Sequence, residues 1–398
     1  MHPDLVVIHT PVGGGHKAAA LAVAAAARAR GLSVEVLDTF EHAPRLFGDA
    51  YLGAHLTAQG ALPDLYGTAF FGTNRRKGAL KPVSRGIDHM AWAGLVRRVI
   101  DLAPRTVIAT HHLPLVVLGR ARLRGRVAAA LVGVVTDYCT HAVWVEKGVD
   151  LLCVPCERAR EDAVGHGFPV DRVRLTGIPV RPEFERLAAV GDPAPGEPLR
   201  VLVTSGGFGV GPVAAIVQSF AGIRDVHLTV VCGDAPALVR RAGAMAARHG
   251  VRADVVGFER DMPARVGQAH VVVGKAGGLT VSETLTAGRP MVIAAAVPGN
   301  ETINSDYVVV GGAGIVARPP DVGKTVAGLR AAGSLSRMGR CARGLVLARA
   351  AERVLDEALR AADLVAPVTP ARPSSPAART YRSPRPSRAP APRRPGAK

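Results

Sequence analysis

The sequence of 398 residues lacks any apolar stretch as long as the roughly 18 residues that a helix needs to span a bilayer. Its alanine-rich segment 18–27 is too short, and Arg28 and Arg30 close it. No basic region precedes the first apolar run, so we expect no signal peptide. These absences favour a cytoplasmic protein over one that spans a membrane.

Cysteine is scarce, with five residues at positions 139, 153, 156, 232 and 341. An odd, sparse set does not predict a disulfide framework, and it fits a reducing cytoplasm. Cys153 and Cys156 form a CxxC without the second pair that a zinc site needs. They are either packed thiols at the end of a strand or a redox or metal pair.

Several catalytic signatures are also missing. The sequence has no GxSxG nucleophile elbow, no HExxH zinc motif and no GxxxxGK[ST] phosphate loop. It has no DxD pair of carboxylates to hold a metal ion between two phosphates. We therefore expect neither a bound metal nor a resident cofactor.

Acidic residues are absent from the tail, residues 366–398, which holds eight basic residues and nine prolines. The tail carries +8 of the net charge of +18 and leaves +10 on residues 1–365. Because it has too little apolar area to offset the entropy of ordering, we expect it to be disordered. It either touches anionic lipid or nucleic acid or is a solvated extension, and no specific nucleic-acid partner is expected.

Apolar runs alternate with helical patterns along the rest of the chain, which predicts an α/β fold of parallel strands covered on both faces. The alternation breaks at the proline- and glycine-rich segment 181–199 and then restarts, which indicates two Rossmann-like, doubly wound domains facing a cleft. The predicted domains are residues 1–190, residues 198–332, and a C-terminal helix in 333–365 expected to pack back on the first domain. The predicted strands are 4–10, 33–38, 106–110, 130–136, 150–154, 199–204, 227–232, 253–256, 270–273 and 290–295.

In each domain one glycine-rich loop follows the first strand. Both loops lie at the edge where open α/β sheets bind ligands. Residues 11–17, PVGGGHK, lead into a helix, and His16 can accept a proton near neutral pH. Residues 205–211, SGGFGVG, are a candidate phosphate cradle. Either loop alone also fits a plain strand–helix turn, in which His16 only caps the helix.

A third loop, GKAGGLTVSETLTAG at 274–288, follows a buried strand. Its two glycines free backbone N–H groups, Thr280 and Ser282 add hydroxyls, and the helix dipole favours phosphate charge. Glu283, one turn into the helix, either accepts ribose hydroxyls or only balances the dipole. The polar loop PGNETIN at 298–304 opens the next helix and offers groups to sugar hydroxyls, or Asn300 merely caps that helix.

Taken in order, these loops resemble glycosyltransferase family 28, and within it the branch of monogalactosyldiacylglycerol synthases and processive diacylglycerol glycosyltransferases. The resemblance covers most of residues 4–360. It implies a GT-B fold, a UDP-sugar donor on domain 198–332, an acceptor on domain 1–190, and inversion at the anomeric carbon without a bound metal. The motifs are GGGHKAAA (13–20), ATHHLP (109–114), VTDYCTHAVWVEKGVDLLCVPCE (135–157), LTGIPVRPEF (175–184), GFERDM (257–262), GKAGGLTVSETLTAGRPMVI (274–293) and PGNETIN (298–304).

The resemblance also implies roles for single residues. His16 matches the position of the general base or of a residue beside it. From its place at a strand end on the same edge, we expect Asp137 to orient His16. By similarity Phe258 lies beside the uracil, Glu283 binds the ribose, and Glu301 and Asn304 face the donor sugar. The other residues expected to bind the UDP-sugar are Gly15, Gly206, Gly207, Gly277, Gly278, Leu279 and Thr280. Because Asn300 stands where the branch often has Gln, the identity of the sugar stays open.

Aromatic and basic residues lie together in two segments of the first domain. Residues 61–82 combine Phe70 and Phe71 with the basic run 75–77, which suits the interface of an anionic membrane. Residues 87–100 place apolar residues at helical spacing around Trp92, which fits either a core-facing helix or a membrane-facing one. We expect Phe70, Phe71 and Trp92 at the membrane or the lipid acceptor.

The sequence thus predicts an inverting, metal-independent hexosyltransferase that moves a sugar from a UDP-sugar to a lipid hydroxyl, with diacylglycerol as the expected acceptor. It would act in the cytoplasm or peripherally on the inner face of the cell membrane. The alternatives are transfer to a polyprenyl-linked precursor or a soluble metabolite, a UDP-sugar 2-epimerase, and a nucleic-acid binder acting through the tail. The sequence does not choose among galactose, glucose, glucuronic acid and N-acetylglucosamine.

Overall fold

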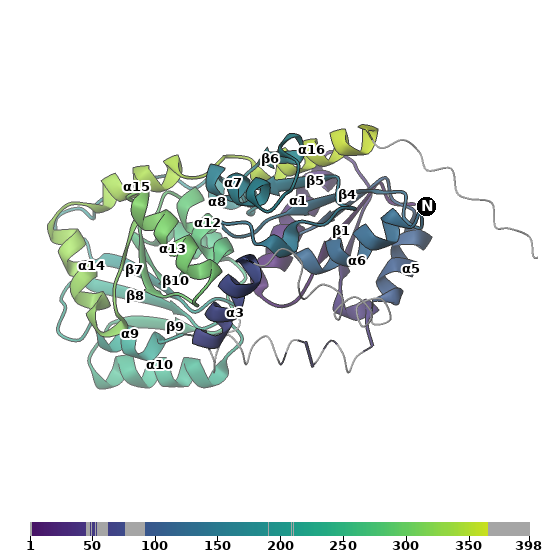
Figure 1. Cartoon of the computed structure of the whole chain (residues 1–398). Coiled ribbons are helices and arrows are strands. Elements are labelled where there is room, and N and C mark those ends of the chain that lie inside the picture. Colours follow the sequence, from purple (N-terminus) through teal and green to yellow (C-terminus); the bar gives the residue numbers. More distant parts are fainter. Residues whose placement is uncertain are drawn as a thin grey trace, which may run out of the picture. The chain divides into compact units, whose positions relative to one another are not determined.

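A computed structural model of the chain gives its architecture (Figure 1). The structure describes residues 2–44, 48, 50–51, 53, 63–75, 92–189, 191–207, 209 and 211–364. The predicted disordered tail, residues 366–398, and the basic residues Arg76 and Lys77 lie outside the described residues. None of the helices described is both long and apolar enough to cross a membrane.

The first half of the chain forms a six-stranded parallel sheet in the order β2-β1-β3-β4-β5-β6. Four of its strands are buried from end to end, because helices cover both faces of a sheet built from Val-, Ile- and Leu-rich runs. Its strands are β1 (Leu5–His9), β2 (Val34–Asp38), β3 (Thr106–Ala109), β4 (Ala130–Val134), β5 (Leu151–Val154) and β6 (Val173–Leu175). Its helices are α1 (Gly14–Ala29), η1 (Phe40–His42), α3 (Pro63–Arg75), α5 (Ala93–Leu102), α6 (His112–Leu123), η2 (Ala142–Trp144), α7 (Glu157–Gly165) and η3 (Val170–Arg172).

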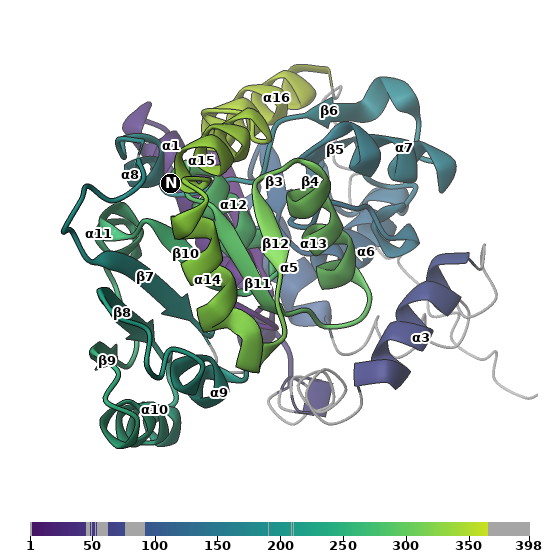
Figure 2. The same ribbon diagram turned by 90° about the vertical axis from the view of Figure 1, so that its left-hand side faces the viewer.

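The second half repeats this architecture, with its strands in the order β12-β11-β10-β7-β8-β9. Figure 2 shows the molecule with this half toward the viewer. Its strands are β7 (Leu199–Thr204), β8 (Val226–Val231), β9 (Ala253–Val256), β10 (Val271–Lys275), β11 (Met291–Ala295) and β12 (Gly314–Val316). The short α8 (Pro182–Glu185) precedes it. Its helices are α9 (Val213–Gln218), α10 (Pro236–Arg248), α11 (Met262–Gln268), α12 (Gly278–Thr286), α13 (Asn300–Val310), η4 (Pro319–Asp321) and α14 (Val322–Ala331).

Two further helices, α15 (Leu335–Gly344) and α16 (Ala350–Leu364), end the described chain. Helix α16 returns to the first half, where its apolar face joins the core built on α1 and β1. Three ion pairs tie it there at 2.5–3.2 Å: Arg30–Asp356, Arg105–Asp363 and Arg174–Glu357. These exposed pairs contribute little each, so the buried apolar face carries the attachment.

The predicted α/β fold of two doubly wound units is confirmed, and all ten predicted strands exist to within two residues at each end. The strands β6 and β12 were not predicted, because each has only three residues and neither shows a clear apolar run. All five cysteines are free thiols. Cys153 lies in β5, and burial raises its pKa to about 12, so the reading as packed thiols at a strand end holds.

Trp92 corrects one prediction. Its side chain is 1 % exposed, precedes α5 and joins the core formed with β1 and α6. Its ring stacks on that of Phe40, with the centroids 5.8 Å apart. The prediction that Trp92 faces a membrane is therefore wrong, and the core-facing interpretation is correct for residues 92–100, the part of the segment 87–100 that the structure describes.

Candidate functional site

The order of strands in each sheet fixes where a ligand can bind. Each first strand, β1 or β7, lies between two neighbours whose connections leave in opposite directions, which makes a switch point. At a switch point the loops beyond the carboxyl ends of the strands diverge and leave room for a ligand. The loops after β1 and β3 flank the switch point of the first sheet, and those after β7 and β10 flank that of the second. Three of these are the glycine-rich loops that the sequence singles out.

His16 lies at the switch point of the first sheet, in the first turn of α1. Its Nδ1 is 2.7 Å from the carbonyl oxygen of Thr110, which follows β3. A carbonyl only accepts, so Nδ1 must carry the proton and Nε2 keeps the lone pair. The Thr110 hydroxyl also donates to the carbonyl oxygen of His16 at 2.8 Å. Thr110 thus fixes both the tautomer and the place of a base whose Nε2 is ready to accept a proton.

Burial lowers the pKa of His16, while the negative charge of Asp137 and the hydrogen bond to Thr110 oppose that change. The imidazole is therefore neutral at physiological pH. A neutral imidazole is the form that a general base requires.

Asp137 does not orient His16 as the sequence predicted. Its Oδ1 accepts hydrogen bonds from Nδ2 of Asn300 at 3.0 Å and from Nδ2 of Asn304 at 2.9 Å, both on α13 of the other half. The Thr110 carbonyl and the Thr136 hydroxyl, 2.7 and 3.1 Å from Nδ1, orient the ring, and Asp137 acts on the imidazole through its charge. The motif ATHHLP contained Thr110, but only the pairing of β1 with β3 brings its carbonyl to His16.

Helix α12 begins beyond β10 without a side-chain cap. The N–H groups of Gly278, Leu279 and Thr280 have no hydrogen-bond partner among the described residues. Beside them, the ammonium of Lys275 lies 3.2 Å from the carboxylate of Glu301. Free N–H groups at the positive end of a helix, next to a lysine, make a site for a phosphate. Lys275 lies in the stretch 274–288, but no pattern there distinguishes this lysine from an ordinary strand-end residue.

Ser282 and Asn304 serve the contact between the halves rather than a ligand. The hydroxyl of Ser282 bonds the Tyr138 hydroxyl at 2.9 Å and donates to the Gly278 carbonyl at 2.8 Å. The buried amide of Asn304 accepts from the Tyr138 N–H at 2.8 Å and donates to Asp137 and to the Ala276 carbonyl. The predicted contacts of these two side chains with donor phosphate and sugar are therefore corrected, because their polar atoms are already bonded.

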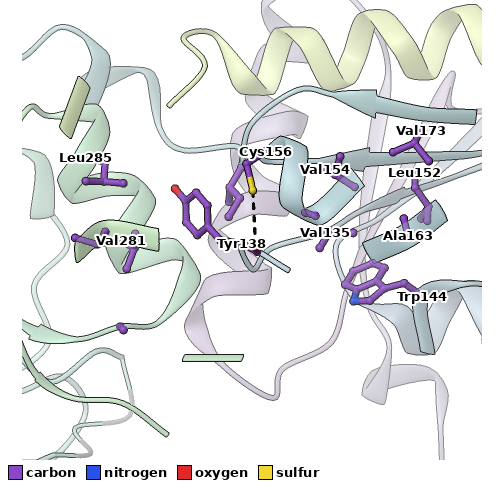
Figure 3. Close-up of a cluster of buried hydrophobic side chains, with 14 of the residues drawn as sticks. Val135, Tyr138, Trp144, Leu152, Val154, Cys156, Ala163, Val173, Val281 and Leu285 are labelled. Atoms are coloured by element: carbon purple, nitrogen blue, oxygen red, sulfur yellow. Dashed lines mark hydrogen bonds between the residues drawn. The ribbon is translucent and has the colours of Figure 1, made fainter. Parts of the chain in front are cut away.

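Figure 3 shows Tyr138 of the first half reaching toward Val281 and Leu285 of α12, and these side chains belong to one buried cluster. Glycines let the halves approach this closely. A Cβ on Gly278 would overlap the Thr136 carbonyl oxygen, and a Cβ on Gly15 would lie 3.3 Å from that of Leu279. The base on α1 and the free N–H groups of α12 thus face one small region.

Three further residues predicted to bind the donor lie in loops after strands of the second sheet. Phe258, in the loop after β9, is 66 % exposed, which leaves its ring free to stack on a base. Gly206 and Gly207 lie in the turn after β7, and Gly206 has a φ of 72°, which favours glycine at that position. The roles predicted for these three residues stay predictions. Among the described residues, no cluster of three or more His, Cys, Asp or Glu side chains is placed to hold a metal ion.

The two phenylalanines of α3 have different surroundings. Phe70 packs inward, with its ring 4.6 Å from that of His141 between centroids. Phe71 is 42 % exposed, and Leu65 on the same helix is 62 % exposed. The prediction of a membrane contact is therefore kept for Phe71 and is corrected for Phe70, whose ring fills a contact within the protein.

Glu283 lies in the second turn of α12, and its carboxylate makes no hydrogen bond or ion pair to the described residues. Burial raises its pKa to about 7, although the charge of Arg181 opposes this. Because the folded pKa lies above the unfolded value, its contribution to stability is complete below about pH 4.5 and is lost as the pH rises through about 7. Ionisation of this carboxyl group therefore lowers the free energy of unfolding. A ligand whose hydroxyl groups donate hydrogen bonds to the carboxylate would offset that loss.

We expect Glu283→Gln to raise thermal stability at pH 8.5 but not at pH 5. The variant removes a buried charge whose ionisation costs about 2–3 kcal/mol of unfolding free energy at high pH. Melting curves of both proteins across this range measure the effect. Glu161→Gln on the exposed side of α7 removes a solvated carboxylate and should show no such trend. Parallel curves for wild type and Glu283→Gln at all pH values would contradict the prediction.

Comparisons with known proteins agree with the motifs. The family model described as monogalactosyldiacylglycerol (MGDG) synthase matches residues 16–180. A processive diacylglycerol beta-glucosyltransferase of Bacillus subtilis (strain 168) is 29% identical over 268 residues, which cover 65% of this chain and 70% of that protein. The chloroplastic monogalactosyldiacylglycerol synthase 2 of Arabidopsis thaliana is 32% identical over 241 residues, 56% of this chain and 51% of that protein. The resemblance that the motifs indicate is confirmed.

The fold has solved counterparts. The crystal structure of Acinetobacter baumannii MurG superposes with a TM-score of 0.60 at 20% identity, covering 90% of this chain and 100% of that one. At this identity the likeness shows the fold alone. It confirms the predicted GT-B arrangement of two Rossmann-like units.

Proposed function

Because the chain is a relative of the monogalactosyldiacylglycerol synthases and processive diacylglycerol glucosyltransferases, we propose that it transfers a hexose from a UDP-sugar to the hydroxyl of diacylglycerol. The named relatives are glycosyltransferases, and this chain is an enzyme of that class. One observation carries the proposal: the uncapped N-terminus of α12 and the Nδ1-protonated His16 face the same region from opposite halves.

The donor half supplies the charge that a nucleoside diphosphate needs. The N–H groups at the start of α12 and the ammonium of Lys275 would bind the diphosphate and stabilise it as it leaves. This is the part that a divalent cation plays in other transferases, and we propose that no metal is required here. Phe258 would stack on the uracil, and ribose hydroxyls would donate to Glu283 and remove the cost of its buried charge.

The acceptor half supplies the base. His16 Nε2 takes the proton of the acceptor hydroxyl as that oxygen forms a bond to C1 of the sugar. The bond from C1 to the β-phosphate oxygen breaks, and its electron pair leaves with UDP. Attack on the face opposite the leaving group inverts the configuration at C1. The proton on Nδ1 stays on the ring and remains hydrogen-bonded to the Thr110 carbonyl, so the same carbonyl stabilises the imidazolium that forms.

A lipid acceptor requires access to a membrane surface. On α3, the side chains of Leu65 and Phe71 are exposed and could make apolar contacts with such a surface. We propose that α3 meets the inner face of the cell membrane, where such side chains enter the interface. The protein would then act as a peripheral enzyme on a substrate that stays in the bilayer.

A screen of UDP release tests the proposed function. The full chain is incubated with UDP-galactose, UDP-glucose, UDP-glucuronic acid or UDP-N-acetylglucosamine, with and without anionic vesicles that contain diacylglycerol. We expect one hexose donor to give UDP and a glycolipid only with diacylglycerol. UDP release that does not depend on diacylglycerol but requires a polyprenyl phosphate or a soluble acceptor would show that diacylglycerol is not the acceptor. Conversion of UDP-N-acetylglucosamine to its 2-epimer would show that the enzyme is an epimerase and not a transferase.

A further inference from the structure

Helix α3 crosses from the first half of the chain to a loop of the second half (Figure 1). A Cβ on Gly67 would lie 2.5 Å from the Cβ of Pro298, and a Cβ on Gly299 would lie 3.0 Å from Cγ of Phe70. Real Cβ atoms essentially never approach another heavy atom within 3.0 Å, so only glycine fits at position 67 without a shift. Gly299 has a φ of 116°, which other residues rarely adopt. Two glycines therefore bring the helix and the loop into direct contact.

The hydrogen bonds that α3 makes through Phe70 and Asn74 are to the first half. Nε2 of His141 bonds the Phe70 carbonyl oxygen at 3.0 Å, and Oδ1 of Asn74 accepts from the N–H of Ala142 at 2.8 Å. Since Nδ1 of His141 accepts from the Val143 N–H, its Nε2 is the protonated nitrogen that donates to the Phe70 carbonyl. The position of α3 is thus set by η2 of the first half.

The loop that α3 touches leads straight into the polar groups of the site. Asn300, next to Gly299, donates to Asp137 at 3.0 Å. Glu301, one residue further, accepts from the Val297 N–H at 2.8 Å and pairs with Lys275 at 3.2 Å. A movement of this loop by about 1 Å would lengthen these bonds beyond the usual range. It would shift the groups that lie beside the predicted diphosphate and sugar.

We propose that α3 is a positioning element for the donor loop: Gly67 and Phe70 hold residues 297–300 where Asn300 reaches Asp137 and Glu301 reaches Lys275. The inference rests on the proposed function, because the loop matters only if a donor sugar binds beside it. The proposal gives a role to residues that contact neither the general base His16 nor the phosphate site. The same helix exposes Leu65 and Phe71, so the surface proposed to meet the lipid and the donor loop are joined by one rigid element.

A pair of glycine substitutions in the one helix tests this proposal. Gly67→Ala adds a Cβ that must displace Pro298, whereas Gly72→Ala adds one with nothing within 4 Å. Both changes favour the helix by a similar amount, so helix propensity cancels in the comparison. We expect Gly67→Ala to lower kcat for transfer by up to about 10²-fold, as misplacement by ~1 Å can, while Gly72→Ala matches the wild type. The affinity for UDP, measured by calorimetry, should change less than kcat in Gly67→Ala and stay unchanged in Gly72→Ala, because the N–H groups of α12 are not touched.

A second substitution checks that the effect passes through this contact. Pro298→Gly removes the atom that the new Cβ meets, and the next neighbours of that Cβ would be backbone atoms 3.5 and 3.6 Å away. The double variant Gly67→Ala/Pro298→Gly should regain kcat relative to Gly67→Ala, with Pro298→Gly alone as the reference. Equal kcat for Gly67→Ala and Gly72→Ala, or no recovery in the double variant, would overturn the positioning role. A wild type that turns over no UDP-sugar would instead refute the proposed function.

Discussion

Replacing His16 by alanine should lower kcat by about 10²–10⁴-fold, the usual contribution of a general base, while UDP binds as before. The residue lies on the acceptor half, and none of its hydrogen bonds reaches α12. Loss of the imidazole should therefore leave the phosphate site intact. Turnover at saturating donor and calorimetry with UDP measure the two quantities separately.

His16→Asn is the matched variant. An asparagine amide can take the place of Nδ1 and donate to the Thr110 carbonyl, but it has no basic nitrogen at the position of Nε2. If His16 is the base, His16→Asn is as slow as His16→Ala while it folds like the wild type. If the asparagine variant keeps near-normal kcat, the imidazole has a structural role and the proposed mechanism fails.

The pH dependence of kcat gives a second check on His16. Burial lowers its pKa, so the neutral form persists below the ordinary value of 6.5 and kcat should fall only in acid beyond that point. Glu283, whose pKa is raised to about 7, changes protonation in the neutral range and should appear in the KM for the donor. An acid limb of kcat that survives in His16→Ala would assign that limb to another group.

Much of this site follows from local sequence patterns. Continuous apolar runs predicted the strands, and each of the loops after β1, β7 and β10 had to lie at the carboxyl edge of its own sheet, because parallel strands all end at that edge. His16 stands directly after three glycines, so its place at the start of a helix followed as well. These inferences need only the neighbours of a residue along the chain.

The partners of side chains across the two halves did not follow. Asn304 and Asp137 are 167 residues apart, and their hydrogen bond depends on how the two sheets face each other. A polar residue in a polar loop reads as ligand-binding when that arrangement is unknown, although its amide is already bonded within the protein. The prediction for Trp92 was wrong for a related reason. The spacing of apolar residues in 87–100 fits a helix that faces the core as well as one that faces a membrane.

The bond between Asn304 and Asp137 makes Asn304→Asp the most damaging change that we expect outside the base. It would place a second carboxylate at about the 2.9 Å that now separates Nδ2 from Oδ1, in a fully buried position. It would also remove the donor to the Ala276 carbonyl. Two carboxylates at this distance cannot both ionise, so one keeps a proton or the halves separate.

At pH 8 an uncompensated buried charge costs about 3–5 kcal/mol, so kcat of Asn304→Asp should fall by about 10²–10³-fold. Near pH 6 the shared proton restores a hydrogen bond between positions 304 and 137, and part of the activity should return, against the trend for the wild type. Asn304→Ala loses the same bonds without adding charge, so its loss should not depend on pH. Wild-type kcat for Asn304→Asp at pH 8 would mean that the two halves do not need this contact when the sugar is transferred.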